Sequence, residues 1–126
     1  MKAFYIPAAV LAMILGFSLW AGQYVALCTG RWTALLEETD AAAMDEDWSG
    51  AAERLEQAYR DWDNSQTFLH TIMEHDQLDE AESLFFGAFA ACREQDNEDF
   101  HIMLAQLIHQ LRLLDEAQAI SIKNVL

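Results

Sequence analysis

The feature that most constrains this chain is a long uncharged segment near its start. No charged residue occurs between Lys2 and Arg31, and most of the residues in the segment are apolar. A helix rises about 1.5 Å per residue, so about twenty apolar residues cross a bilayer core of about 30 Å. The segment can span a membrane with some tilt, or begin as a short interfacial turn around Pro7. We therefore predict a transmembrane anchor over residues 1–30.

The anchor is expected to stay on the protein rather than to be cleaved. Its apolar run exceeds the roughly 7–15 residues of a secretory signal peptide. Leu19, Trp20 and Tyr24 are bulky where cleavage requires small residues. Val25–Cys28 is only faintly similar to a lipoprotein cleavage box, because Leu27 occupies a position that needs a small side chain.

The charges that flank the segment give weak information on its orientation. Lys2 and the α-amino group favour a cytoplasmic N-terminus, whereas Arg31 on the other side favours the reverse. We predict a single-pass protein with its N-terminus inside and the rest of the chain outside the membrane.

The remainder of the chain is strongly acidic. The 126 residues include 7 Lys and Arg against 21 Asp and Glu, for a net charge of −14. Since only Lys2 precedes the anchor, residues 31–126 carry a net charge of −15. Such a domain is repelled by nucleic-acid phosphates and by anionic lipid headgroups. This excludes nucleic acid as a partner and leaves one small soluble domain after the anchor.

Residues 31–126 show the 3.6-residue apolar periodicity of amphipathic helices. Alternation typical of strands is absent. The stripes run over residues 32–44, 48–74, 78–92 and 100–114. We expect a kink or break at 61–65, an N-cap at Asp96 or Asn97, and docking of the apolar tail 120–126. The short connections predict an all-α fold, in which a small antiparallel bundle follows the transmembrane helix.

The acidic segment 45–56 matches the spacing of a calcium-binding EF-hand loop, D-x-D-x-S-G-x5-E. In that loop, oxygen ligands occupy positions 1, 3 and 5, an invariant glycine follows, and a glutamate occupies position 12. The candidate metal ligands are Asp45, Asp47, Ser49 and Glu56. Calcium is the one cofactor that the sequence suggests.

Two positions argue against this calcium loop. Trp48 is bulky at position 4, and Ala52 replaces the larger aliphatic residue that is usual at position 8. Trp48 also continues the helical stripe, which a calcium loop would interrupt. The simpler interpretation is a helix start with Asp45 or Asp47 as its N-cap.

No motif in the chain is typical of catalysis. His70, Glu74, His75 and Asp79 form the one cluster of histidines and carboxylates, and helix-surface hydrogen bonds explain it. A nucleophile motif of the Gly-x-Ser-x-Gly type and a glycine-rich phosphate loop are both missing. We expect a protein that is not an enzyme.

Small residues follow one face of the predicted anchor. Ala8, Ala12 and Gly16 recur at four-residue spacing, which lets another helix approach closely within a membrane. The partner that this face predicts is another membrane protein or a second copy of the chain.

Several short motifs together resemble one family. They are Asp47-Trp48-x-x-Ala51, Trp62, Phe68-Leu69 through His75, Leu78-Asp79 and the ending Ser121-Ile122-Lys123-Asn124-Val125-Leu126. The chain resembles the bacterial family DUF4363, a domain of unknown function. The resemblance implies a small single-pass protein of the bacterial cytoplasmic membrane, with no assigned chemistry and with genes beside those of multi-pass membrane proteins. It also favours Trp48 as a helical residue.

These observations lead to two functional hypotheses. The first is a non-enzymatic, membrane-anchored accessory or scaffold protein that pairs with a multi-pass membrane protein or with itself. The alternative is an extracytoplasmic module that binds or senses a cation through the acidic 45–56 segment.

Overall fold

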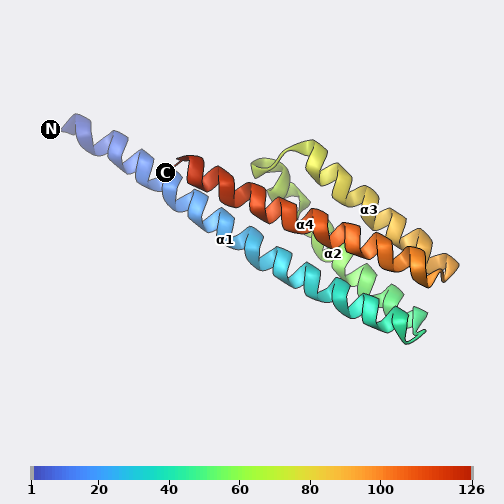
Figure 1. Cartoon of the computed structure of the whole chain (residues 1–126). Helices are drawn as coiled ribbons and strands as arrows, with labels where there is room; N and C mark the ends of the chain where they lie inside the picture. Colours follow the sequence, from blue (N-terminus) through green and yellow to red (C-terminus); the bar gives the residue numbers. More distant parts are fainter. Residues whose placement is uncertain (1, 126) are drawn as a thin grey trace.

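The computed structural model describes the backbone of residues 2–125 and the side chains of residues 3–120 and 123. Four helices follow one another through short turns: α1 (Lys2–Met44), α2 (Trp48–Ile72), α3 (His75–Glu94) and α4 (Asn97–Val125). They run antiparallel in an up-down-up-down order (Figure 1). Residues 2–125 contain no strand. The predicted all-α fold with a long apolar N-terminal helix is confirmed.

Helix α1 extends well beyond the bundle at its N-terminal end (Figure 1). None of its side chains between residues 3 and 20 is buried, and the first buried one is Ala21. The helix includes Pro7, so the interfacial turn considered for that position is absent. Pro7 lacks one backbone N–H donor, and the helix continues through it.

The bundle encloses one core, with α1 packed against α2 and α4, and α3 packed against α4 and, less extensively, α2. Its centre is aromatic: the rings of Trp32 and Trp62 meet edge to face with centroids 5.4 Å apart, and Phe85 lies 5.9 Å from Trp62. Burying aromatic side chains of this size supplies much of the free energy that holds a small bundle together.

The expected break at residues 61–65 does not occur. Helix α2 continues through this stretch because Trp62 and Ser65 face the core, whereas Asp63 and Asn64 are exposed. The Ser65 hydroxyl donates to the carbonyl oxygen of Asp61 at 3.1 Å. Polar residues weaken a helix only slightly when a core-facing stripe is maintained between them.

The predicted domain boundary after residue 30 falls inside the bundle. Ala21, Val25 and Cys28 of α1 are all buried in the core. A bilayer and a protein interior accept the same apolar side chains, so composition alone does not separate the two environments. Cys28 and Cys92 are both buried and unpaired, so no disulfide joins them.

The helix ends follow ordinary capping rules. The Asp47 carboxylate accepts from the backbone N–H of Gly50 at 3.0 Å and caps α2, and Asp96 accepts from the N–H of Asp99 at 3.1 Å and caps α4. Gln95 ends α3 in the left-handed region, with φ of 55°. The predicted tail 120–126 is helical as far as Val125. Ile120 is exposed, and the docking of the tail's other apolar side chains lies outside the described residues.

Candidate membrane junction

Three aromatic side chains gather where α1 enters the bundle. Trp20 stacks on Tyr24 with ring centroids 5.6 Å apart. Phe68 of α2 meets both rings edge to face, at 5.5 Å from Trp20 and 4.8 Å from Tyr24. Trp and Tyr concentrate at membrane–water interfaces because their rings are apolar with a polar edge. We call Trp20, Tyr24 and Phe68 the aromatic collar.

The collar divides the uncharged segment of the sequence into two parts. Residues 3–20 have no buried side chain and, as a helix, measure about 27 Å. Residues 21–30 pack within the bundle. α1 is the one described helix long and apolar enough to cross a membrane, with a mean hydropathy of 1.9 in its most apolar stretch, no part of which is buried by the rest of the chain.

The end of the bundle that carries the collar also carries exposed charge. Phe68 is level with Trp20, and α2 ends one turn later at Ile72. Glu74 follows in the turn, Asp76 lies in the first turn of α3, and both are exposed. Carboxylates are costly in hydrocarbon. These two carboxylates therefore require water around this end of the bundle.

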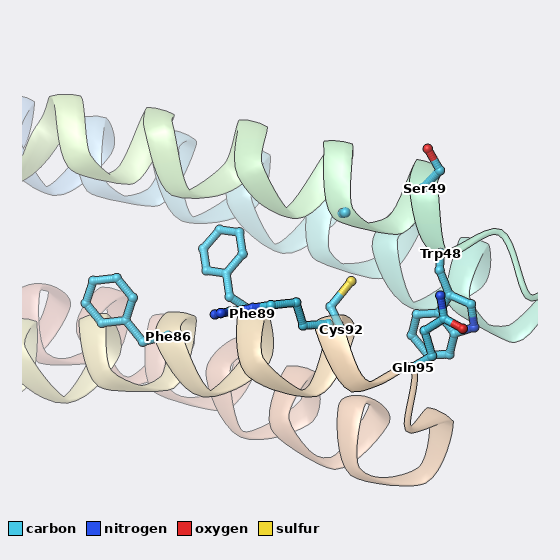
Figure 2. A pocket seen from close by; sticks show the side chains of 8 residues that line it. Trp48, Ser49, Phe86, Phe89, Cys92 and Gln95 are labelled. Atoms are coloured by element: carbon cyan, nitrogen blue, oxygen red, sulfur yellow. The ribbon is translucent and has the colours of Figure 1, made fainter.

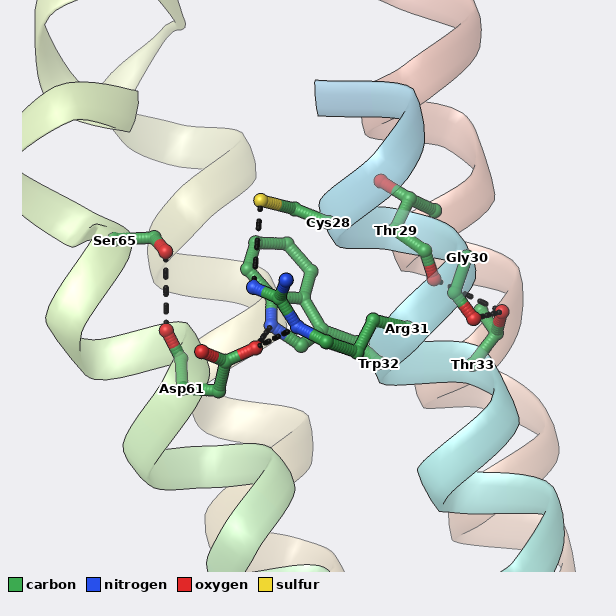
Figure 3. Close-up of polar contacts among 8 residues, drawn as sticks. All are labelled: Cys28, Thr29, Gly30, Arg31, Trp32, Thr33, Asp61 and Ser65. Carbon is green, nitrogen blue, oxygen red and sulfur yellow. Dashed lines mark hydrogen bonds and ion pairs between the residues drawn. The ribbon is translucent and has the colours of Figure 1, made fainter. Parts of the chain in front are cut away.

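A polar cluster joins α1 to α2 deeper in the bundle. One carboxylate oxygen of Asp61 accepts from the Arg31 Nε at 2.6 Å and from the indole Nε1 of Trp32 at 2.8 Å (Figure 3). The guanidinium also lies 3.7 Å from the Cys28 sulfur. Arg31 is the first charge after the anchor, and the structure neutralises it with a carboxylate thirty residues away.

The Asp61 carboxylate has an electrostatic effect on its partner. The hydrogen bond to Asp61 is the main reason that the pKa of Arg31 lies above its usual value, and burial acts in the opposite direction. Trp32 is buried, so the Asp61 oxygen is what satisfies its indole N–H. The cluster therefore fixes the register of α1 against α2 next to the collar.

The structure does not form a calcium loop over residues 45–56. α2 begins at Trp48, so Ser49 and Glu56 are helical, and Asp47 is occupied as the N-cap. Glu56 contacts Arg60, one turn along the same helix. Among the side chains of residues 3–120 and 123, no group of three or more His, Cys, Asp or Glu is arranged to hold a metal ion. Asp45, Asp47, Ser49 and Glu56 are therefore not brought together.

The histidine–carboxylate cluster is divided by the turn between α2 and α3. α2 ends at Ile72, so His70 and Glu74 do not share a helix face. His70 instead meets His75, with the two Nδ1 atoms 2.9 Å apart, so that one imidazole donates and the other accepts. The pair links the end of α2 to the start of α3.

The helical periodicity of the sequence does not distinguish Asp61 and Phe68 from their neighbours. Asp61 falls within the predicted helix break, and Phe68 is one more residue of an apolar stripe. Asp63 flanks the core residue Trp62 equally and is exposed, so the pattern gives no signal that is specific to Asp61. Its partners are thirty residues away, and only the packing of α1 on α2 identifies them.

The comparisons with known proteins identify one family. No curated protein and no solved structure matches the chain. One family model matches residues 19–125, which begins beside Trp20 and covers the bundle. The chain belongs to the family described as a domain of unknown function, DUF4363.

Proposed function

We propose that this chain is a non-enzymatic, single-pass membrane protein in which residues 3–20 cross the bilayer and the acidic bundle stands at its surface. The observation that supports this proposal is the exposed apolar part of α1, which continues into the bundle without a break. Phe4, for example, is 83% exposed, and large apolar side chains follow it to Trp20. Soluble monomers rarely expose an apolar surface of this extent.

The proposed role is accessory, through pairing within the membrane. Ala8, Ala12 and Gly16 are exposed and lie outside the bundle. A Cβ added at Gly16 would meet no heavy atom within 4 Å, so this face is open to another helix. Because α1 is continuous, a partner that turns or tilts the anchor would also move the bundle.

The proposed location is the bacterial cytoplasmic membrane, with the N-terminus inside and the bundle outside. The basic residue before the anchor, Lys2, supports this orientation. A Glu53→Cys variant tests it in intact cells, because Glu53 is exposed while both native cysteines are buried. Labelling by a membrane-impermeant maleimide is expected before lysis. Labelling only after lysis would show the opposite orientation.

Membrane insertion is tested by placing charge in the free part of α1. We expect the Leu11→Arg, Ile14→Arg double variant to leave the membrane fraction on alkaline extraction, because arginine near the bilayer centre costs about 2.5–3.5 kcal/mol. Ala34→Arg, on an exposed position of α1 within the bundle, is the control and is expected to stay in the membrane. Equal extraction of the two variants would argue against the proposed span.

Pairing is tested by co-purification from native membranes in mild detergent, followed by mass spectrometry. We expect one multi-pass protein, or a second copy of the chain, to be recovered with the wild type. The Ala12→Ile, Gly16→Ile variant is expected to lose it, because the added side chains block close approach. Met13→Ile, at a neighbouring exposed position, should retain it. A wild-type chain that is recovered alone as a monomer would end the accessory proposal.

A further inference from the structure

A cleft of about 640 Å³ opens between α2 and α3, at the end of the bundle away from the collar. Its volume lies within the range of small-molecule sites, about 300–1,000 Å³. Phe86, Phe89 and Cys92 follow one another along α3, with Gln95 beside Trp48 at the far end (Figure 2). The lining residues are Trp48, Ser49, Ala52, Phe86, Phe89, Cys92, Arg93 and Gln95.

The cleft is apolar along its length and polar at its edges. Of the neighbouring helix pairs, α2 and α3 contact each other least, and Ala52 is the small side chain that α2 contributes to the wall. Phe86 is 54% exposed, which is unusual for a phenylalanine beside a well-packed core. An apolar wall with few polar groups at its margin is the common form of a site for a small ligand.

Arg93 is the one arginine of the described residues that has no carboxylate partner. Each of the other arginines lies within 4.0 Å of a carboxylate: Arg31, Arg54, Arg60 and Arg112. Arg93 has no ion pair or side-chain hydrogen bond within the part of the chain that the structure describes. In a chain of net charge −14, a cation that lines an apolar cleft without a carboxylate partner is complementary to an anionic ligand.

The net charge of the bundle and the length of the cleft limit which ligand can occupy the cleft. A second copy of the chain is disfavoured at the cleft, because two bundles that each carry about −15 repel one another. The apolar wall from Phe86 to Arg93 is about 10 Å long at the helical rise, which suits the part of a hydrocarbon tail nearest its headgroup. We propose that this cleft binds an amphiphile with an apolar tail and one anionic headgroup, the tail lying along Phe86 and Phe89 and the headgroup at Arg93.

The test uses the full chain in lipid nanodiscs and a twelve-carbon fatty carboxylate that carries a photoreactive diazirine on its tail. After illumination, peptide mass spectrometry identifies the labelled residues. Probe dissolved in the bilayer labels residues 3–20, whereas probe in the cleft labels residues 48–52 and 86–95. We expect saturable labelling of the cleft, which unlabelled dodecanoate reduces at least tenfold and dodecyltrimethylammonium does not.

Two variants and one control separate the site from general charge effects. Arg93→Glu is expected to reduce cleft labelling at least tenfold, and Ala52→Trp to remove it by filling the cleft. Arg112→Glu makes the same charge change on α4, and labelling of its cleft is expected to equal that of the wild type. Label confined to residues 3–20, cleft labelling that does not saturate, or equal labelling of Arg93→Glu and Arg112→Glu would each overturn the proposal.

Discussion

At the scale of single residues, the most consequential side chain is Asp61. It is one-third exposed, yet one of its oxygens serves both a surface guanidinium and a buried indole. Exposed ion pairs contribute little to stability, because water screens them and long side chains lose freedom. The buried indole N–H is different, since it has no water to replace the carboxylate. Asp61 therefore contributes to stability mainly through the hydrogen bond that it accepts from the Trp32 indole.

Replacing Asp61 with alanine is expected to lower the free energy of unfolding by about 2 kcal/mol, since a buried donor is left without a partner. Urea unfolding of the detergent-solubilised full chain, followed by tryptophan fluorescence, measures this loss. Asp63→Ala, an exposed aspartate on the same helix, is the control and should change stability by less than about 0.5 kcal/mol. Equal losses would show that Asp61 supports α1 no more than a surface charge does.

Tyr59 links α2 to α3 and makes stability depend on alkaline pH. Its hydroxyl donates to Glu82 at 3.1 Å, and burial, followed by this hydrogen bond, raises the pKa of the phenol above its usual 10.0. A raised folded-state pKa means that the folded protein holds this proton more tightly than the unfolded chain. The stabilisation is complete below pH 10.0 and is lost as the pH rises through the folded-state pKa.

Tyr59→Phe is expected to cost about 1 kcal/mol at neutral pH, through the lost hydrogen bond. The difference from the wild type should shrink above about pH 10, because tyrosinate no longer donates to Glu82. Unfolding free energies measured in parallel from neutral to alkaline pH test this. A constant difference across the whole range would contradict the assignment.

At the scale of elements, the beginning of α2 shows how one acidic pattern is compatible with two structures. Both a calcium loop and a helix N-terminus favour Asp at the same positions, because each needs oxygen acceptors. What distinguishes them is whether Trp48, Ala51 and Leu55 continue a buried helical stripe. In the structure Ala51 and Leu55 are buried and Trp48 packs against Phe100 at 5.5 Å, so the helix forms.

Asp47→Ala is expected to destabilise the bundle by about 1 kcal/mol, the usual cost of losing an N-cap. Asp45→Ala removes the same charge from the preceding turn and should have little effect. Thermal melting of the two variants beside the wild type measures the difference. An equal effect of both substitutions would indicate general charge rather than capping.

Calcium is expected to leave the melting temperature of the full chain unchanged at millimolar concentration. Asp47 is engaged with Gly50 and Glu56 with Arg60, and the helix holds Ser49 and Glu56 apart from any common centre. Differential scanning calorimetry with calcium or with excess chelator measures this. A calcium-dependent rise that Glu56→Gln abolishes would revive the cation-binding hypothesis.

At the scale of the whole molecule, repulsion among the negative charges is the main electrostatic effect that opposes folding. The bundle carries a large excess of carboxylates, and its ion pairs lie at the surface. Repulsion among the carboxylates acts over a Debye length, about 10 Å at 0.1 M salt, and favours expansion. The aromatic core opposes that expansion.

We expect the melting temperature of the full chain to rise as sodium chloride increases from about 0.01 M to about 0.5 M, since screening weakens the repulsion more than it weakens a few exposed pairs. Circular dichroism melts in a non-ionic detergent measure this. A Glu53→Lys, Glu80→Lys variant, changed at two exposed positions, should show a smaller rise, because its net charge is smaller in magnitude. A fall in melting temperature with salt would mean that the ion pairs outweigh the repulsion.

The local pattern of the sequence determined the helices, the antiparallel order and the long apolar N-terminal helix. The 3.6-residue period, the capping aspartates and the absence of charge between Lys2 and Arg31 are short-range properties that a reader of the chain can see. Tertiary structure alone decided where the exposed part of α1 ends and the core begins, because an apolar residue such as Val25 gives no sign of which part it belongs to. It also decided which distant groups meet, such as Asp61 with Trp32, since contacts between residues about thirty positions apart leave no periodic signal. The cleft between α2 and α3 depends in the same way on how two helices pack.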